Sequence, residues 1–129
     1  PSGGYFSTAA DCARFGRMVL RGGELDGRRV LSRAAVEQMT TDQTGDGGYG
    51  LGWSIAPAGE WDAPAGGGGG FGHGGAMGTK LFVHPRAGRV AVLMVHQDGG
   101  FDTDGAPLHQ HWWGRLRTEL LSAGLEQAS

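Results

Sequence analysis

The sequence predicts an α+β fold in which helices pack on an antiparallel sheet of at least three strands. Two stretches with helical signals come first, strand-type stretches then follow one another between residues 49 and 97, and a further helical stretch closes the chain. Strands that follow one another without a helix between them can pair as antiparallel hairpins. No internal repeat or linker divides the 129 residues, so we expect them to form one unit.

The first helix is predicted from the signals at its ends. Thr8-Ala9-Ala10-Asp11 fits a variant of the capping box, with Ser7 as a rival N-cap. Gly22-Gly23 is expected to end this helix, because glycine readily takes the left-handed conformation found at helix C-termini. Leu25-Asp26-Gly27 then reads as a turn.

A second, short helix is predicted to run from Ser32 to about Thr40. Ser32 can serve as its N-cap. Leu31 and Val36 stand at the spacing of a hydrophobic staple, which fixes the direction in which the chain enters a helix. Residues 42–48 then form a polar loop.

Strands are predicted over residues 49–56, 70–84 and 89–97. Residues 49–56 alternate large apolar and small side chains with strict period two, which indicates a half-buried strand. Val90 to Val95 are uniformly apolar, so we expect the last strand to be central and covered on both faces. Pro85-Arg86-Ala87-Gly88 is expected to join the last two strands as a hairpin, with Gly88 left-handed.

The final helix is predicted over residues 107–123. Its apolar residues recur every fourth position, and this stripe is expected to lie on the sheet; the residues are Leu108, Trp112, Leu116 and Leu120. The glycine run at residues 66–70 is interpreted as a surface loop.

Composition excludes several classes of partner. The net charge is −2 and the basic residues form no run, so nucleic acid is not expected as a partner. Cys12 is the single cysteine, which rules out an intrachain disulfide. No apolar stretch approaches the ~18 residues of a membrane span. The chain begins at Pro1 and not at Met, so we expect the native N-terminus to lie upstream, and the compartment stays open.

A complete nucleophilic site is missing from the sequence. Ser54 misses the G-x-S-x-G pattern at its last position and lies inside a predicted strand instead of at a strand-to-helix elbow. No serine is followed three residues later by lysine, and the absence of asparagine excludes Y-x-N and S-D-N motifs. A self-sufficient serine enzyme is therefore not expected.

Phosphate and metal sites are also poorly supported. Gly70 to Gly75 match G-x-G-x-x-G, but a strand follows where a dinucleotide site needs the start of a helix. Among five histidines, His109 and His111 diverge at a helix start, whereas His84 and His96 on neighbouring strands could lie close. No cysteine or carboxylate cluster completes a ligand set, so neither a metal nor a cofactor is predicted.

The most informative signal is the order of several longer pieces. PSGGYFSTAAD at residues 1–11 precedes a helix, and it is followed by GELDGRRVLS at residues 23–32, GYGLGW at residues 48–53 and FGHGGAMGT at residues 71–79. A strand pair and a C-terminal helix complete the pattern. In order and spacing, residues 1–122 resemble the C-terminal part of the serine beta-lactamase and penicillin-binding-protein-like hydrolases, which include class C beta-lactamases, DD-peptidases and esterases. The resemblance implies the C-terminal part of a beta-lactamase/transpeptidase-like fold.

The resemblance also implies roles for particular residues. In the family, the nucleophilic serine of S-x-x-K and the tyrosine of Y-x-N lie upstream, and a third motif, K-T-G or H-T-G, lies on an edge strand beside the serine. His73, Gly74 and Gly75 match that motif. By this match His73 and Gly75 are catalytic, Ala76 supplies an oxyanion-hole N–H, and Gly74 and Met77 contact the substrate.

Two departures from the family pattern bear on the substrate. His73 stands where beta-lactamases usually have lysine, whereas DD-peptidases and esterases often have histidine. Gly74 stands where many members have a threonine whose hydroxyl helps to hold the substrate carboxylate. The resemblance therefore favours an esterase or amide hydrolase over a true beta-lactamase or carboxypeptidase.

Together these observations predict that residues 1–129 are the C-terminal segment of a larger serine hydrolase. Its nucleophile would lie in a missing N-terminal part, so the chain alone should be inactive. Its partners would be a small ester, amide or beta-lactam substrate and that missing part, with self-association through exposed apolar surface as a further expectation. The alternative is a non-catalytic ligand-binding or structural module derived from the same fold.

Overall fold

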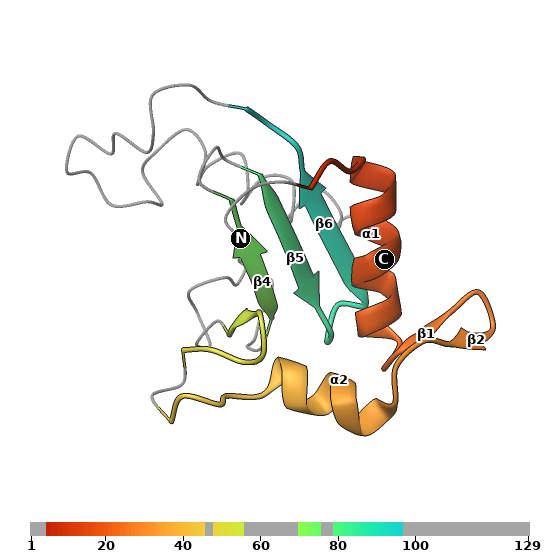
Figure 1. Cartoon of the computed structure of the whole chain (residues 1–129), viewed down its shortest axis with the longest axis vertical. Coiled ribbons are helices and arrows are strands. Elements are labelled where there is room, and N and C mark those ends of the chain that lie inside the picture. The colour runs from red at the N-terminus through yellow and green to blue at the C-terminus, as the bar shows by residue number, and fades with distance from the viewer. Residues whose placement is uncertain (1–4, 46–47, 56–69, 76–78, 97–129) are drawn as a thin grey trace.

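In the part of the chain that the structure describes, a four-stranded antiparallel sheet carries a helix on one face (Figure 1). The structure is a computed structural model that describes residues 5–45, 48–55, 70–75 and 79–96. Its elements are α1 (Ala9–Leu20), β1 (Glu24–Leu25), β2 (Arg28–Arg29), α2 (Arg33–Thr40), β3 (Ser54–Ile55), β4 (Phe71–Gly74), β5 (Lys80–His84) and β6 (Arg89–Leu93). The strand order is β3-β4-β5-β6, and α1 packs on β5 and β6. The predicted α+β class is confirmed, while the predicted helix at 107–123 lies outside the described residues.

Helix α1 begins and ends where its sequence signals indicate. Thr8 is the N-cap: its hydroxyl oxygen accepts the Asp11 backbone N–H at 3.1 Å. At the other end Gly22 has a φ of +63°, and the N–H groups of Gly22 and Gly23 donate to the carbonyls of Val19 and Met18, each at 2.9 Å. These two bonds satisfy carbonyls that a helix end would leave without partners.

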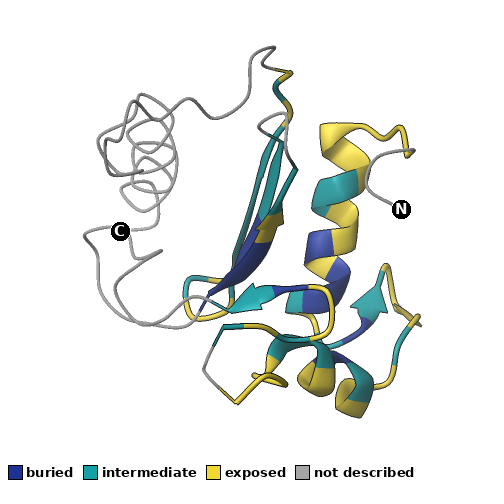
Figure 2. Cartoon of the chain, turned by 60° about the vertical axis from the view of Figure 1, so that its left-hand side comes forward, coloured by how far each residue is buried: buried dark blue, intermediate teal, exposed yellow. Residues whose placement is uncertain are grey.

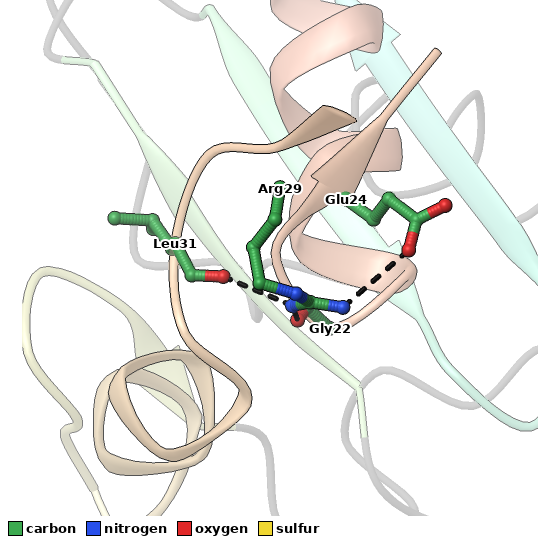
Figure 3. A network of polar contacts seen from close by, with 4 residues as sticks. All are labelled: Gly22, Glu24, Arg29 and Leu31. Atoms are coloured by element: carbon green, nitrogen blue, oxygen red, sulfur yellow. Dashed lines mark hydrogen bonds and ion pairs between the residues drawn. The ribbon is translucent and has the colours of Figure 1, made fainter. Parts of the chain in front are cut away.

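A short hairpin, β1 and β2, follows α1. Its turn residues Asp26 and Gly27 have φ values of +50° and +76°, the left-handed pair that a tight two-residue hairpin requires. Arg29 then ties the hairpin to both neighbouring segments (Figure 3). Its Nη1 donates to the carbonyls of Gly22 and Leu31, both at 3.0 Å, and its Nη2 lies 3.4 Å from the Glu24 carboxylate. The end of α1 is thereby joined to the chain that enters α2.

Helix α2 also matches its prediction. The Ser32 hydroxyl accepts the Ala35 N–H at 3.1 Å, and the helix ends at Thr40. Val36 is buried and Leu31 packs against the same core, as the staple spacing predicts.

The prediction of one strand over residues 49–56 is wrong. Within the described residues the chain reverses on itself: Tyr49 bridges Ser54, the Gly50 N–H donates to the Trp53 carbonyl at 2.8 Å, and only Ser54–Ile55 forms a strand. Gly52 supplies the reversal with a φ of +80°, a conformation that side chains disfavour. The residues that show the alternating pattern therefore form a glycine-rich turn followed by a short strand.

The prediction of one strand over residues 70–84 is also wrong. β4 and β5 are separate strands that pair in antiparallel register, with Gly74 opposite Lys80. Next to that pair, the Gly75 N–H donates to the Thr79 carbonyl at 2.8 Å. Gly70 is the last residue of the glycine run that was interpreted as a surface loop, and it is buried against the Phe82 ring, which a Cβ at this position would meet. Residues 66–69 are not described.

The last described hairpin is partly as predicted. Gly88 has a φ of +63° between β5 and β6, which confirms the hairpin. Among the described strands, however, β6 stands at the end of the sheet order and its residues are only half buried, so the central position predicted for it is wrong here. The register pairs His84 with Arg89 and Lys80 with Leu93, so His84 and His96 lie toward opposite ends of the hairpin and cannot share a ligand.

The core lies between the sheet, α1 and α2. Its buried members are Met18, Val19, Val36, Trp53, Phe71 and Val83, and Figure 2 shows the buried side of α1 turned toward the sheet. Gly16 allows this close approach, since a Cβ there would come within 2.5 Å of a Val90 methyl group. None of the described helices is long and apolar enough to cross a bilayer.

Candidate active site

His73 lies on β4 just beyond the last residue of this strand that pairs with β3. β3 pairs with Phe71 and Gly72, and within the described residues this pairing stops there. His73 and Gly74 are paired on the other side only, with Leu81 and Lys80 of β5. β4 is therefore not the edge strand that the family resemblance implied, but its C-terminal half has a local open edge. A polar side chain at such a point can face a ligand while its backbone is held by the sheet.

Both ring nitrogens of His73 have hydrogen-bond partners. The Tyr49 hydroxyl lies 2.7 Å from Nε2, and the Gly74 carbonyl oxygen lies 2.9 Å from Nδ1. The two aromatic rings meet edge to face, with centroids 5.8 Å apart and planes at 72°. The side chain is exposed, so the orientation of the imidazole depends on these contacts and not on packing in the core.

The space beside Gly74 is occupied by Lys80. A Cβ at Gly74 would collide with the Lys80 side chain, and the first atom that it would meet is the ammonium nitrogen. The two residues are cross-strand partners, so the lysine extends over the glycine backbone. A threonine at this position would thus have to displace the end of the flexible Lys80 side chain, which belongs to the only lysine of the sequence.

Gly75, the last residue of the His73-Gly74-Gly75 motif, directly follows β4. A Cβ there would collide with the Thr79 hydroxyl oxygen, and the Gly75 N–H already donates to the Thr79 carbonyl. A larger residue at position 75 would therefore have to displace the Thr79 hydroxyl. Ala76 and Met77, the predicted oxyanion donor and substrate contact, lie outside the described residues.

An open cavity of about 640 Å³ lies beside His73. We call it the His73 cavity; residues of its wall include Tyr5, Phe6, Ser7, Lys80, Val92 and Met94. His73 faces it together with Leu81 and Val92, which are consecutive register partners on β5 and β6. Its size falls within the ~300–1,000 Å³ of small-molecule sites, and its lining combines apolar side chains with a few polar groups.

The described serines do not form a nucleophile and base pair with His73. Ser54 lies in β3 opposite Gly72, and Ser32 caps α2. Ser7 lines the His73 cavity, where its hydroxyl accepts the Cys12 thiol at 3.6 Å. In the part of the chain that the structure describes, no three histidine, cysteine or carboxylate side chains are grouped as metal ligands.

Tyr49, like Lys80, was not assigned to the site from the sequence. It is 24 positions from His73, and its alternation with neighbouring glycines indicated a strand. The available signal was its place in the GYGLGW piece at residues 48–53, which contributed to the family resemblance without a role for the tyrosine.

Comparison with known families gives a match over most of the chain. The family model described as Beta-lactamase matches residues 1–111. Among relatives, penicillin-binding protein 4 of Amycolatopsis lactamdurans is 38% identical over 115 residues, which cover 80% of this chain and 28% of that protein. Protein Rv1367c of Mycobacterium tuberculosis is 33% identical over 122 residues, covering 81% of this chain and 30% of that protein.

A solved structure from Bacillus anthracis, described as a 6-aminohexanoate-dimer hydrolase, has a similar fold. It superposes with a TM-score of 0.54 at 29% identity, covering 94% of this chain and 30% of that one. The chain thus spans about 30% of the length of the proteins that it matches.

Proposed function

Because the chain belongs to the beta-lactamase family, we propose that it forms one wall of a serine-hydrolase active site with His73-Gly74-Gly75 as the third motif. The observation that carries the proposal is the position of His73: its imidazole stands at the open edge of β4, oriented by two hydrogen bonds, on the wall of the His73 cavity. An edge of this kind can bind an acyl group along its backbone while a neighbouring side chain adjusts the field at the reacting carbonyl.

The proposed reaction is acyl transfer to a serine that precedes residue 1 of this chain. The serine oxygen adds to the carbonyl carbon of an ester or amide, the alcohol or amine leaves with a proton, and water then releases the acid. The Ala76 N–H would stabilise the oxyanion, a role that needs no particular side chain. Gly75 would let the substrate approach the strand, and Met77 would contact it.

The substrate class follows from the Gly74 position. Threonine would offer a hydroxyl there, whereas Gly74 offers only backbone and the neighbouring Lys80 side chain. The site therefore lacks the hydroxyl that many members of the family use to hold a substrate carboxylate. We propose small esters or amides as substrates ahead of carboxylate-bearing beta-lactams, and equally fast turnover of the latter, through pairing with the Lys80 ammonium, would contradict this assignment.

The remainder of the proposed enzyme would cover the apolar wall of the His73 cavity. Tyr5 and Phe6 are 91% and 104% exposed, and Met94 beside them is 41% exposed. Large apolar side chains gathered at one cavity mark a surface that another segment covers. We propose that the nucleophile-bearing part packs here, with self-association of the isolated chain as the competing arrangement.

The isolated chain is expected to be inactive. Purified residues 1–129, incubated with nitrocefin and with p-nitrophenyl esters, should show no saturable turnover above the buffer rate, because the acylated serine is absent. Ser7→Ala is the informative variant, since Ser7 is the described serine on the cavity wall. Saturable turnover by the chain that is lost in S7A would show that the nucleophile lies within these residues and would overturn the proposal.

A further inference from the structure

We propose that Tyr49 is a positioning residue that holds the His73 imidazole in one tautomer and one orientation. The catalytic consequence of this inference rests on the proposed function, whereas the contact itself does not. Two contacts of the imidazole support it: Tyr49 Oη lies 2.7 Å from His73 Nε2, and His73 Nδ1 lies 2.9 Å from the Gly74 carbonyl oxygen.

The partner of Nδ1 identifies the tautomer that is present. A backbone carbonyl oxygen has lone pairs and no hydrogen, so it can only accept, and Nδ1 must therefore carry the proton. In the neutral ring Nε2 is then a bare lone pair, which accepts the Tyr49 O–H. The order of donation is thus Tyr49 hydroxyl to Nε2, and Nδ1–H to the Gly74 carbonyl.

The tyrosine hydroxyl suits both protonation states of the ring. When Nε2 gains a proton, the phenolic oxygen becomes the acceptor, and its O–H bond, which stays intact, rotates away from the ring. The imidazole can therefore change charge without losing its orientation. A phenylalanine at position 49 would keep the edge-to-face ring contact but could do neither.

The backbone of Tyr49 is fixed independently of its side chain. Tyr49 bridges Ser54, its carbonyl accepts the Gln43 N–H at 2.7 Å, and the Leu51 N–H donates to Met39 at 3.0 Å. Gly50 passes so close to the Met39 carbonyl that a Cβ would collide with it. The tyrosine ring, 42% exposed, is thus presented to His73 from a rigid turn and not held in the core. This separation means that removing the hydroxyl should change the imidazole far more than the fold.

The contact is tested by nitrogen NMR of the protein labelled with ¹⁵N-histidine. In its neutral form, His73 is expected to be the Nδ1–H tautomer, with a hydrogen-bonded Nε2. In Tyr49→Phe the Nε2 signal should shift and the Nε2–H tautomer should become populated. Tyr5→Phe removes the only other tyrosine hydroxyl of the chain and should leave the His73 signals in place. A parental ring found as Nε2–H, or identical His73 signals in parent and Y49F, overturns the inference.

The catalytic consequence is tested by a double-mutant cycle in the protein that contains the nucleophile. Y49F is expected to lower kcat about three- to tenfold with little change in KM, which is the range that one hydrogen bond to a reacting group provides. In a His73→Ala background the same change should have no further effect, because Tyr49 acts through that ring. Equal fold-losses in both backgrounds would show a role independent of His73 and overturn the inference.

The two tests separate the inference from the proposed function. A protein without hydrolase activity that still shows the tyrosine-dependent tautomer contradicts the function and leaves the contact intact. An active enzyme that loses turnover in His73→Ala but is unchanged in Y49F, in both kinetics and spectra, retains the function and contradicts the inference.

Discussion

Replacing His73 by alanine in the full-length protein is expected to lower turnover about a hundredfold, by analogy with the loss of one group that shapes the electrostatic field at a reacting carbonyl. The change removes the only histidine on β4 and also leaves the Tyr49 hydroxyl without its 2.7 Å partner. Since His73 is exposed, little packing is lost, and the free energy of unfolding should change by about 1 kcal/mol or less. Steady-state kinetics on a chromogenic ester, with urea denaturation in parallel, measures both quantities.

The matched control is His84→Ala. His84 lies at the opposite end of β5, where its Nδ1 accepts the Ala87 N–H at 3.1 Å within the hairpin turn. This variant should lose about 1 kcal/mol of stability with that hydrogen bond and keep the parental kcat. Parental turnover in His73→Ala, or an equal loss of turnover in both variants, would refute a catalytic role for His73.

Trp53→Ala is expected to destabilise the fold by about 3–5 kcal/mol, the usual cost of removing a buried aromatic side chain. Trp53 is 3% exposed and stacks on Phe15 with ring centroids 5.9 Å apart. It also meets Phe71 in a T-shaped contact with ring centroids 5.1 Å apart. Because Phe71 and His73 are two residues apart on β4 and share one face of the sheet, the cavity left by the indole lies beside the candidate site.

Urea unfolding of the chain measures this loss. Leu51→Ala is the control, because Leu51 belongs to the same turn but is 53% exposed, and its truncation should cost within about 0.5 kcal/mol. A loss below about 1 kcal/mol for Trp53→Ala would mean that the turn at residues 49–53 does not anchor β4 as the structure indicates.

The parts of the fold that follow from local rules could be predicted from sequence. The N-caps Thr8 and Ser32 and the left-handed Gly88 depend on neighbours within a few residues, and the structure confirms all of them. Such features are decided by backbone hydrogen bonds and by the conformations open to each residue type.

The turn at residues 49–53 could not be predicted from its pattern. Alternating large and small residues satisfy a strand, but here Gly50 is needed for close approach to α2 and Gly52 for a φ of +80°. The same glycines are compatible with either structure, and tertiary contacts decide between them.

Some residues of the candidate site could likewise be predicted from the sequence, and others could not. His73, Gly74 and Gly75 were found through the family resemblance, because the motif is contiguous in sequence. Tyr49 and Lys80 were not, since each reaches the motif through strand pairing or a long-range hydrogen bond that no sequence spacing encodes. Residue type alone also could not show that Lys80 fills the volume beside Gly74.

We propose that this chain supplies a wall of the site while the acylated serine lies elsewhere in the protein. The most direct measurement is treatment of the full-length protein with a serine-directed acylating probe, followed by peptide mapping of the labelled residue. We predict stoichiometric labelling of one serine that precedes residue 1 of this chain, and slower labelling in His73→Ala. Labelling at Ser7 or at any other serine within residues 1–129, or saturating labelling of the isolated chain, would contradict the account.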